Sequence, residues 1–400
     1  MWAPPQPSVV DATRARRRLA GVVFLVLLAQ VLLYPGIDAL VAALGAETTL
    51  DASMWFLAAE FAAFVVFAGV WGAVSDATGL RRPLILVGAV LGAGGYLLLG
   101  VLPGPLASSF LAVLLTRALQ GAATVGAFSL AMTTLLDLDG PDGRNMGAAG
   151  LAIGGGTAIG APLGGQLYEV GTLVPLYAAC GFLLAAAALA VSLPAVSPRE
   201  SRGTAREALA GLRETPGLLV PYAFGFLDRT AAGFFALVGT LYFRESFGLS
   251  AGETGLVLAL FFAPFALLQY PFGALSDRVG RTVPIAGGSA AFGVAVAATG
   301  LVPTVELAGA GMVAVGVLGA LMAPATMALV GDLVGEDRRG VAMAGFNVAG
   351  SVGFLAGILV GGLLADAYGY PAAFVAVGGV EVALAAVAIP ALVRLERAAA

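Results

Sequence analysis

Long apolar segments separated by short polar breaks run through the whole sequence. A membrane-spanning helix needs about 20 mostly apolar residues, and twelve segments of that kind can be counted. Most of the breaks contain proline, glycine or charged residues, and the regular alternation of a transmembrane β-strand is absent. The pattern predicts an all-α integral membrane protein with twelve spans. They lie near residues 19–42, 52–75, 83–102, 106–136, 145–167, 172–195, 217–243, 253–275, 283–302, 307–331, 341–365 and 371–393.

Composition supports this interpretation. Of the 400 residues, 60% are hydrophobic and 11% are charged, whereas soluble domains contain about 25% charged residues. A soluble chain of this size could not bury that much apolar surface, so we expect lipid to solvate it.

Several residue types are missing, and their absence excludes classes of chemistry. The sequence contains no His and no Lys, and its one cysteine is Cys180. His-dependent catalytic triads, the Walker A lysine, lysine Schiff bases, internal disulfides and cysteine-based zinc sites are therefore excluded. We expect no enzymatic activity, no cofactor and no metal.

The arginines predict the orientation. Seventeen lie in the breaks on one side of the predicted membrane and Arg244 lies on the other, while Arg117 and Arg229 fall inside spans. Positively charged loops stay in the cytoplasm, so both termini are expected there, in a multi-pass protein of the cell membrane. The first apolar segment is too long for the core of a signal peptide, which favours an uncleaved first span.

The two halves of the chain repeat each other at an offset near 200 residues. Gly-Ala-Val-Ser-Asp-Ala-Thr-Gly at 72–79 corresponds to Gly-Ala-Leu-Ser-Asp-Arg-Val-Gly at 273–280. Asp137 and Arg144 recur with the same spacing as Asp332 and Arg339. We predict an N-terminal six-helix bundle (1–195), a cytoplasmic linker (196–216) and a C-terminal six-helix bundle (217–400). A pseudo-two-fold axis would relate the bundles, with the site between them.

These motifs resemble those of the major facilitator superfamily over nearly the whole chain. The second copy of the cytoplasmic signature is the more complete, because the first keeps Asp76, Gly79 and Arg81 but has Ala77 and Leu80 at positions that are usually basic. Arg-Ala-Leu-Gln-Gly at 117–121 resembles a signature linked with proton coupling, and the Gly- and Pro-rich fifth span resembles that of antiporters. The resemblance implies a transporter of the twelve-span drug/proton antiporter branch. Its expected partners are a small-molecule substrate, protons and membrane lipid, without nucleic acid, and the chain is expected to be a monomer.

Polar and ionisable residues inside the spans are the candidates for the substrate and proton cavity, because buried charge in a bilayer is costly and usually functional. They are Asp38, Glu60, Arg117, Gln120, Asp228 and Arg229. Glu60 and Arg117 are each expensive to bury alone, so we expect their side chains to meet. Pro35-Gly36 is expected to interrupt the first helix. An interfacial role for Asp38 and a purely structural ion pair for Arg117 are the alternatives, and Glu381 in the last span has no explanation at this stage.

Charged residues at the cytoplasmic ends of the spans could form networks that hold one conformation and break in another. The alternative is that they only fix the topology. They are Asp76, Arg81, Asp137, Arg144, Asp277, Arg278, Arg281, Asp332 and Arg339. Asp277 is expected near the beginning of the eleventh span.

A second group, rich in glycine, is predicted to let helices approach closely. It contains Gly156, Gly160, Pro162, Gly164, Gly165, Gly357, Gly361 and Gly362.

The sequence therefore favours a secondary transporter that works by alternating access, with proton-coupled efflux ahead of proton-coupled uptake of a sugar or an organic anion. A membrane enzyme or sensor is the alternative from a different class. Residues 139–144 partly match a phosphatidyltransferase motif and Gly331-Asp332 partly matches an intramembrane aspartyl protease, but both motifs are incomplete.

Overall fold

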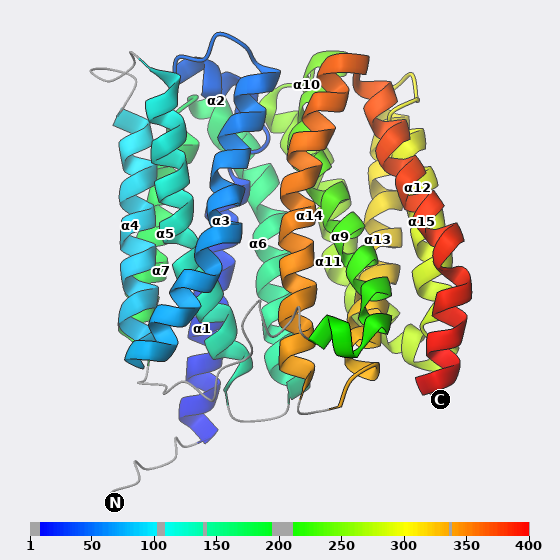
Figure 1. Cartoon of the computed structure of the whole chain (residues 1–400). Helices are drawn as coiled ribbons and strands as arrows, with labels where there is room; N and C mark the ends of the chain where they lie inside the picture. Colours follow the sequence, from blue (N-terminus) through cyan, green and yellow to red (C-terminus); the bar gives the residue numbers. More distant parts are fainter. Residues whose placement is uncertain (1–8, 102–108, 139–141, 194–210, 336–337, 400) are drawn as a thin grey trace, which may run out of the picture.

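The computed structural model describes residues 9–101, 109–138, 142–193, 211–335 and 338–399, and its elements over these ranges are helices (Figure 1). In chain order they are α1 (Val9–Val31), α2 (Ile37–Ala43), α3 (Leu50–Thr78), α4 (Arg81–Val101), α5 (Phe110–Leu136), α6 (Asp142–Val170), α7 (Val174–Val191), η1 (Pro216–Leu218), α9 (Leu219–Phe234), η2 (Phe235–Gly239), α10 (Thr240–Phe247), α11 (Ala251–Val279), η3 (Val283–Gly287), α12 (Gly288–Thr299), α13 (Val305–Asp332), α14 (Arg339–Tyr368) and α15 (Tyr370–Ala399).

The predicted all-α membrane fold is confirmed. Ten helical segments within the described residues are long and apolar enough to cross a membrane, and Val283–Thr299 is a shorter apolar helix. The first predicted span corresponds to α1 and α2. Most of the predicted linker lies at 194–210, outside the described residues, as does the beginning of the 139–144 motif. The division into domains at 195 and 217 therefore stays a prediction.

The first span is interrupted where the sequence places Pro35-Gly36. Helix α1 ends at Val31 and α2 begins at Ile37, with turns between them. Proline lacks the N–H that would continue the ladder of hydrogen bonds, and its ring disfavours a helical residue before it. The expected interruption is therefore present, and it lies inside the span rather than at its end.

The sequence repeat reappears as a repeat in helix packing. In the first half α1 packs against α6, α3 against α5 and α4 against α7, and in the second half α9 packs against α14, α11 against α13 and α12 against α15. The halves meet crosswise, with α6 against α11 and α3 against α14 (Figure 1). This is the pseudo-symmetric arrangement that the repeat predicts.

The glycine-rich helices lie at the closest approaches. On α6, Gly156 and Gly160 lie against α1: a Cβ added to Gly156 would be 2.9 Å from the carbonyl oxygen of Phe24, and one added to Gly160 would be 3.0 Å from the Cβ of Val31. Without the hydrophobic effect to drive helices together in lipid, such small residues make close packing possible. The other members of the group lie at similar contacts, with Gly164 against Leu32, Gly165 against Ala251, Pro162 beside Gly255, Gly357 against Thr230, Gly361 against Phe234 and Gly362 against Met54.

Contacts between the halves concentrate towards one end of the molecule. We call this end, which carries α2 and α10, the closed face, and the opposite end, with Arg81 and Arg281, the arginine-rich face. Near the closed face, a Cβ at Gly362 would lie 2.7 Å from the sulfur of Met54. Deeper in, the rings of Phe61 and Phe354 stack with centroids 4.1 Å apart. Towards the arginine-rich face, a Cβ added to Gly72 of α3 or Gly150 of α6 would meet no atom within 4 Å.

Candidate transport site

A buried ion pair joins α3 to α5 in the first half. A terminal nitrogen of Arg117 donates a hydrogen bond to Oε2 of Glu60, and both side chains are 0% exposed. The glycine of the Arg-x-x-Gln-Gly motif allows this approach, because a Cβ at Gly121 would lie 2.9 Å from the carbonyl oxygen of Glu60. The predicted meeting of Glu60 and Arg117 is confirmed, while their roles in transport stay predictions.

Helix α5 holds the guanidinium of Arg117 from its other side. Arg117 donates to the side-chain oxygen of Gln120 over 2.6 Å, and the amide of Gln120 donates to the hydroxyl of Thr124 over 2.7 Å. The rings of Phe56 and Tyr96 lie with their centroids 4.7 Å and 5.4 Å from the central carbon of the guanidinium. These contacts hold a cation electrostatically, so Arg117 keeps partners even without Glu60.

Three polar atoms at the centre of the first half make no hydrogen bond of ordinary geometry: Oε1 of Glu60, Nε of Arg117 and Nε2 of Gln30. The amide of Gln30 nevertheless lies close enough to the Glu60 carboxylate to interact with it, so polar groups of α1, α3 and α5 meet here. The sequence analysis did not include Gln30, Phe56 or Tyr96 among the site residues. Gln30 could have been found from its four-residue spacing from Tyr34, which puts both on one face of the helix. Nothing in the sequence distinguishes Phe56 and Tyr96 from aromatic residues of the core.

The second half has no such ion pair at the equivalent place. Gly316 approaches the carbonyl of Phe261 as Gly121 approaches that of Glu60, so Phe261 occupies the place of Glu60. Met312, four residues before Gly316, corresponds to Arg117, and both Phe261 and Met312 are buried. The ion pair therefore breaks the pseudo-symmetry.

Asp38 contacts the other half of the molecule at the closed face. Its carboxylate accepts a hydrogen bond from Nε of Arg244 over 2.8 Å, and both side chains are 18% exposed. Arg244 also donates to the carbonyl of Leu249 over 3.1 Å. Nearby, the carboxylate of Glu169 on α6 accepts from the backbone N–H of Gly252, in the first turn of α11, over 2.8 Å. The structure thus places Asp38 in a contact between α2 and α10, while its role in the cavity or at the membrane interface stays a prediction.

Asp228 and Arg229 differ in their surroundings although they are adjacent on α9. Asp228 is partly buried and lies within electrostatic reach of both the buried Glu381 and its neighbour Arg229. Arg229 is exposed and runs beside α14, where a Cβ at Gly350 would lie 3.1 Å from its Cγ. Within the described residues Arg229 has no carboxylate within ion-pair distance. The structure does not bring either residue into contact with Glu60 or Arg117.

Glu381 acquires a partner that the sequence did not reveal. Its carboxylate, on α15, accepts a hydrogen bond from the hydroxyl of Ser289 on α12, and both residues are buried. Two helices that pack against each other within the second half therefore share this polar contact.

Ion pairs at the arginine-rich face follow the repeat. Arg81 contacts Asp137 at 2.6 Å in the first half, and Arg281 contacts Asp332 at 3.0 Å in the second. Arg281 also contacts Asp277 at 2.6 Å. Within the described residues Asp76, Arg144 and Arg278 are exposed and make no ion pair, and Arg339 donates to the carbonyl of Gly331 over 3.4 Å. Each network therefore lies inside one half.

The expected position of Asp277 beside the start of the eleventh span stays a prediction. That span is α14, which packs against α3, whereas α11 with Asp277 packs against α6. Arg281 links Asp277 to Asp332, and Arg339 at the start of α14 donates to the carbonyl of Gly331 beside Asp332.

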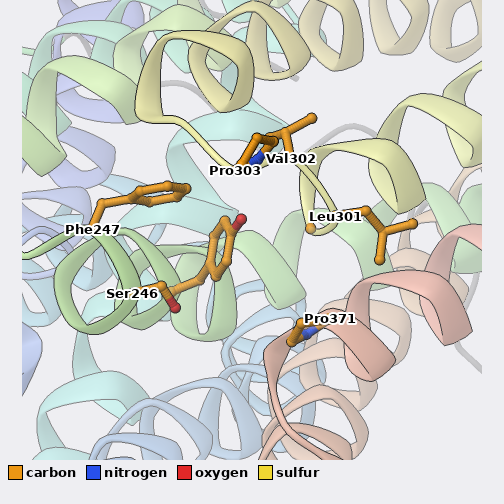
Figure 2. Close-up of a pocket in the computed structure, with 8 residues that line it drawn as sticks. Ser246, Phe247, Leu301, Val302, Pro303 and Pro371 are labelled. Atoms are coloured by element: carbon orange, nitrogen blue, oxygen red, sulfur yellow. The ribbon is translucent and has the colours of Figure 1, made fainter.

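A shallow pocket at the closed face lies away from the buried ion pair. It has a volume of about 340 Å³ and lies between α10, the turn after α12 and the start of α15 (Figure 2). Its lining includes Phe247, Val302 and Pro303 and no Asp, Glu or Arg side chain. Nor does any group of three or more His, Cys, Asp or Glu residues in the described ranges have the arrangement to hold a metal ion.

The sequence profile of the Major Facilitator Superfamily matches residues 19–237 and 222–400. The chain belongs to this superfamily. Its members are membrane transporters, so this chain is a multi-pass membrane transporter of small molecules and not an enzyme. Among curated proteins, an uncharacterised MFS-type transporter of Methanocaldococcus jannaschii is 30% identical over 144 residues, 36% of this chain and 37% of that protein. The multidrug resistance protein MdtG of Yersinia enterocolitica is 31% identical over 131 residues, 31% of each chain. These matches span about a third of the relatives' length.

Solved structures match over almost the whole chain. The nucleoside transporter NupG superposes with a TM-score of 0.76 at 14% identity, covering 94% of this chain and 99% of NupG. A bacterial homologue of the human lysosomal transporter Spinster, in an inward-facing and unoccupied conformation, gives 0.75 at 16% identity, with 98% of each chain covered. The human organic anion transporter MFSD10 gives 0.67 at 19% identity over 97% of this chain and all of that one. At these identities the likeness concerns the fold.

Proposed function

We propose that this transporter exports a small molecule in exchange for protons, with Glu60 as the proton-carrying group. The observation that supports this proposal is the buried Glu60–Arg117 pair, an ionisable carboxylate and its cation that are both 0% exposed inside the spans. We further propose that the protein works as a monomer in the cell membrane, with the arginine-rich face and both termini in the cytoplasm.

The pair couples protonation to conformation through α3. An ionised Glu60 needs Arg117 inside the membrane, whereas a protonated Glu60 does not, because removing its charge removes the cost of burying it. Arg117 remains held by Gln120 in either state. Since α3 also packs against α14 of the other half, loading a proton would loosen α3 from α5 and change the contact between the halves. The two protonation states would then favour different conformations, as alternating access requires.

Direction is proposed from the branch that the motifs resemble. The name of the MdtG relative describes multidrug resistance, which agrees with efflux. The conformation is proposed to be inward-facing, because the halves contact near α2 and α10 and the Spinster homologue of similar fold is described as inward-facing. Proton-coupled uptake of a sugar or organic anion is the second candidate, and the exposed Arg229 favours an anion.

Flux into proteoliposomes under an imposed pH gradient tests the proposal. The compound panel contains organic cations, sugars and organic anions, and internal pyranine reports proton movement. We expect at least one compound to move against protons. Glu60→Gln should retain binding of that compound but respond little to the gradient, because the amide keeps the shape and cannot exchange a proton.

Glu381→Gln is the matched control, since it also replaces a buried carboxylate in a span by an amide. We expect it to keep gradient-driven flux. The proposal would be overturned if Glu60→Gln, driven by the pH gradient alone, accumulated the transported compound to the wild-type level.

A further inference from the structure

Arg229 places a positive charge at mid-depth in a membrane span. It is the fourteenth residue of the 32-residue span Pro216–Phe247, and its side chain is exposed. Exposure of a guanidinium to lipid tails at that depth is strongly unfavourable, and charged groups in spans face the bundle interior or a water-filled space. Arg229 therefore faces the water-accessible space between the two halves.

The guanidinium of Arg229 makes no ion pair within the described residues, unlike that of Arg117, the other arginine inside a predicted span, which is paired with Glu60. No described carboxylate lies within 4 Å of the Arg229 guanidinium. Asp228 is close enough for a longer-range attraction to Arg229, but adjacent helix positions point about 100° apart, so the guanidinium keeps its hydrogen-bond donors for another anion.

The surface of α14 beside Arg229 carries hydrogen-bond donors. Gly350 is buried against the Arg229 side chain, since a Cβ there would lie 3.1 Å from the Cγ of Arg229. Asn347 and Ser351 lie within one turn of Gly350 and are four residues apart, so they share one face of α14. Both are exposed. An amide N–H2 and a hydroxyl can donate to the same anion that Arg229 attracts.

We propose that Arg229, with Asn347 and Ser351, binds an anionic group of the transported molecule, such as a carboxylate, sulfonate or phosphate. The planar guanidinium can bind such a group through two parallel hydrogen bonds. The proposal rests on the proposed transport function and assigns its substrate to the organic anions.

An anion at this place would also link occupancy to closure of the halves. Closing the empty protein would move a cation without a directly bonded partner out of water, whereas closing it around an anion would bury a neutral pair. The occupied protein would therefore change sides more readily than the empty one.

Binding measurements without a pH gradient test this proposal independently of proton coupling. Purified protein is titrated with aromatic compounds that share a skeleton and differ in charge, such as derivatives of benzoate (anionic), benzamide (neutral) and benzylamine (cationic). Binding is measured as the increase in thermal stability of the protein. We expect the stabilising compounds to be anions. Arg229→Gln should raise their Kd about tenfold or more, and Arg229→Lys should raise it less, because Lys keeps the charge but not the two parallel hydrogen bonds.

Arg394→Gln is the matched control, because Arg394 is exposed on α15 near the arginine-rich face. It should leave the Kd unchanged. The proposal is overturned if neutral or cationic compounds are the ones that bind, if no anion in the series binds, or if Arg229→Gln and wild type bind anions equally. If Glu60→Gln still binds anions but loses gradient-driven flux, both proposals are supported. If Glu60→Gln keeps its flux while Arg229→Gln loses anion binding, only the proposal of Glu60 as proton carrier is rejected.

Discussion

Arg117 and Glu60 differ in how much they depend on each other. Arg117 has Gln120 and two aromatic rings in addition to the carboxylate. Among the described residues Glu60 has one cationic partner, Arg117, and its other polar neighbours are the uncharged amides of Gln30 and Gln120. An ionised Glu60 is therefore the member that cannot remain buried alone. At the equivalent positions of the second half, Phe261 and Met312 show that the fold accepts apolar residues there.

Arg117→Met should consequently destabilise the protein more than removal of both charges. Breaking a buried pair from one side costs about 3–5 kcal/mol, while replacing both partners is often close to neutral. We expect Glu60→Leu combined with Arg117→Met to recover most of the unfolding free energy that the single change loses. Unfolding in detergent, followed by tryptophan fluorescence, measures both. The prediction would be contradicted if the double variant lost as much unfolding free energy as the two single variants together.

Among the elements, α2 and α10 form the charged contact between the halves at the closed face. Asp38 reaches Arg244 across it, and Glu169 accepts a hydrogen bond from the backbone N–H of Gly252 in the first turn of α11. A carboxylate at a helix N-terminus is favourable because the first N–H groups lack partners within the helix. Both contacts must separate when this face opens, so they stabilise the observed conformation relative to the other.

Reversing one charge of this contact should change transport, and reversing both should restore it. With each side chain 18% exposed, solvent screens the pair, and about 1 kcal/mol is a reasonable value, or about a fivefold shift between conformations. Asp38→Arg and Arg244→Asp should each alter the rate of flux several-fold, and the double variant should return towards wild type. A double variant as impaired as the worse single variant would argue against a gate at this place.

For the whole molecule, the crosswise packing of the halves predicts how the arginine-rich face closes. Helices α6 and α11 run antiparallel, so residue numbers fall along α6 while they rise along α11, from Gly165 against Ala251 to Gly154 against Ala266. If this pairing continued to the arginine-rich face, Arg144 would lie opposite Asp277. The pairs Gly362–Met54 and Phe354–Phe61 extend in the same way to Arg339 opposite Asp76. Asp76, Arg144 and Arg339, which make no ion pair among the described residues, would then gain one in the other conformation, and Asp277 would gain a partner besides Arg281.

Cysteine cross-linking tests this closure. In a Cys180→Ser background, Arg144→Cys with Asp277→Cys should form a disulfide that blocks transport until reductant is added, since the two Cα atoms must come within about 7 Å. The matched control combines Asp277→Cys with Arg339→Cys, the two positions that the sequence alone predicted to be neighbours. This control pair should not cross-link. Efficient linking of the control pair alone would refute the crosswise closure.

The sequence by itself determined the features that depend on local composition and on repetition. Uninterrupted apolar segments fix the spans because a helix must satisfy its own backbone in lipid, and Pro35 interrupts the first of them because it lacks an N–H. The repeats around Asp76 and Asp277 were enough to predict two pseudo-symmetric halves. The meeting of Glu60 with Arg117 followed from the cost of burying either charge alone.

The tertiary structure decided which distant side chains meet. Asp38 pairs with Arg244, Glu381 with Ser289, and Asp277 lies on a helix that faces α6 rather than α14. The sequence could not distinguish these partners because the faces of the spans are almost uniformly apolar, so no periodicity marks which helix each face contacts. In lipid that choice depends on close steric fit at small residues such as Gly121 and Gly165, and steric fit exists only once the helices are assembled.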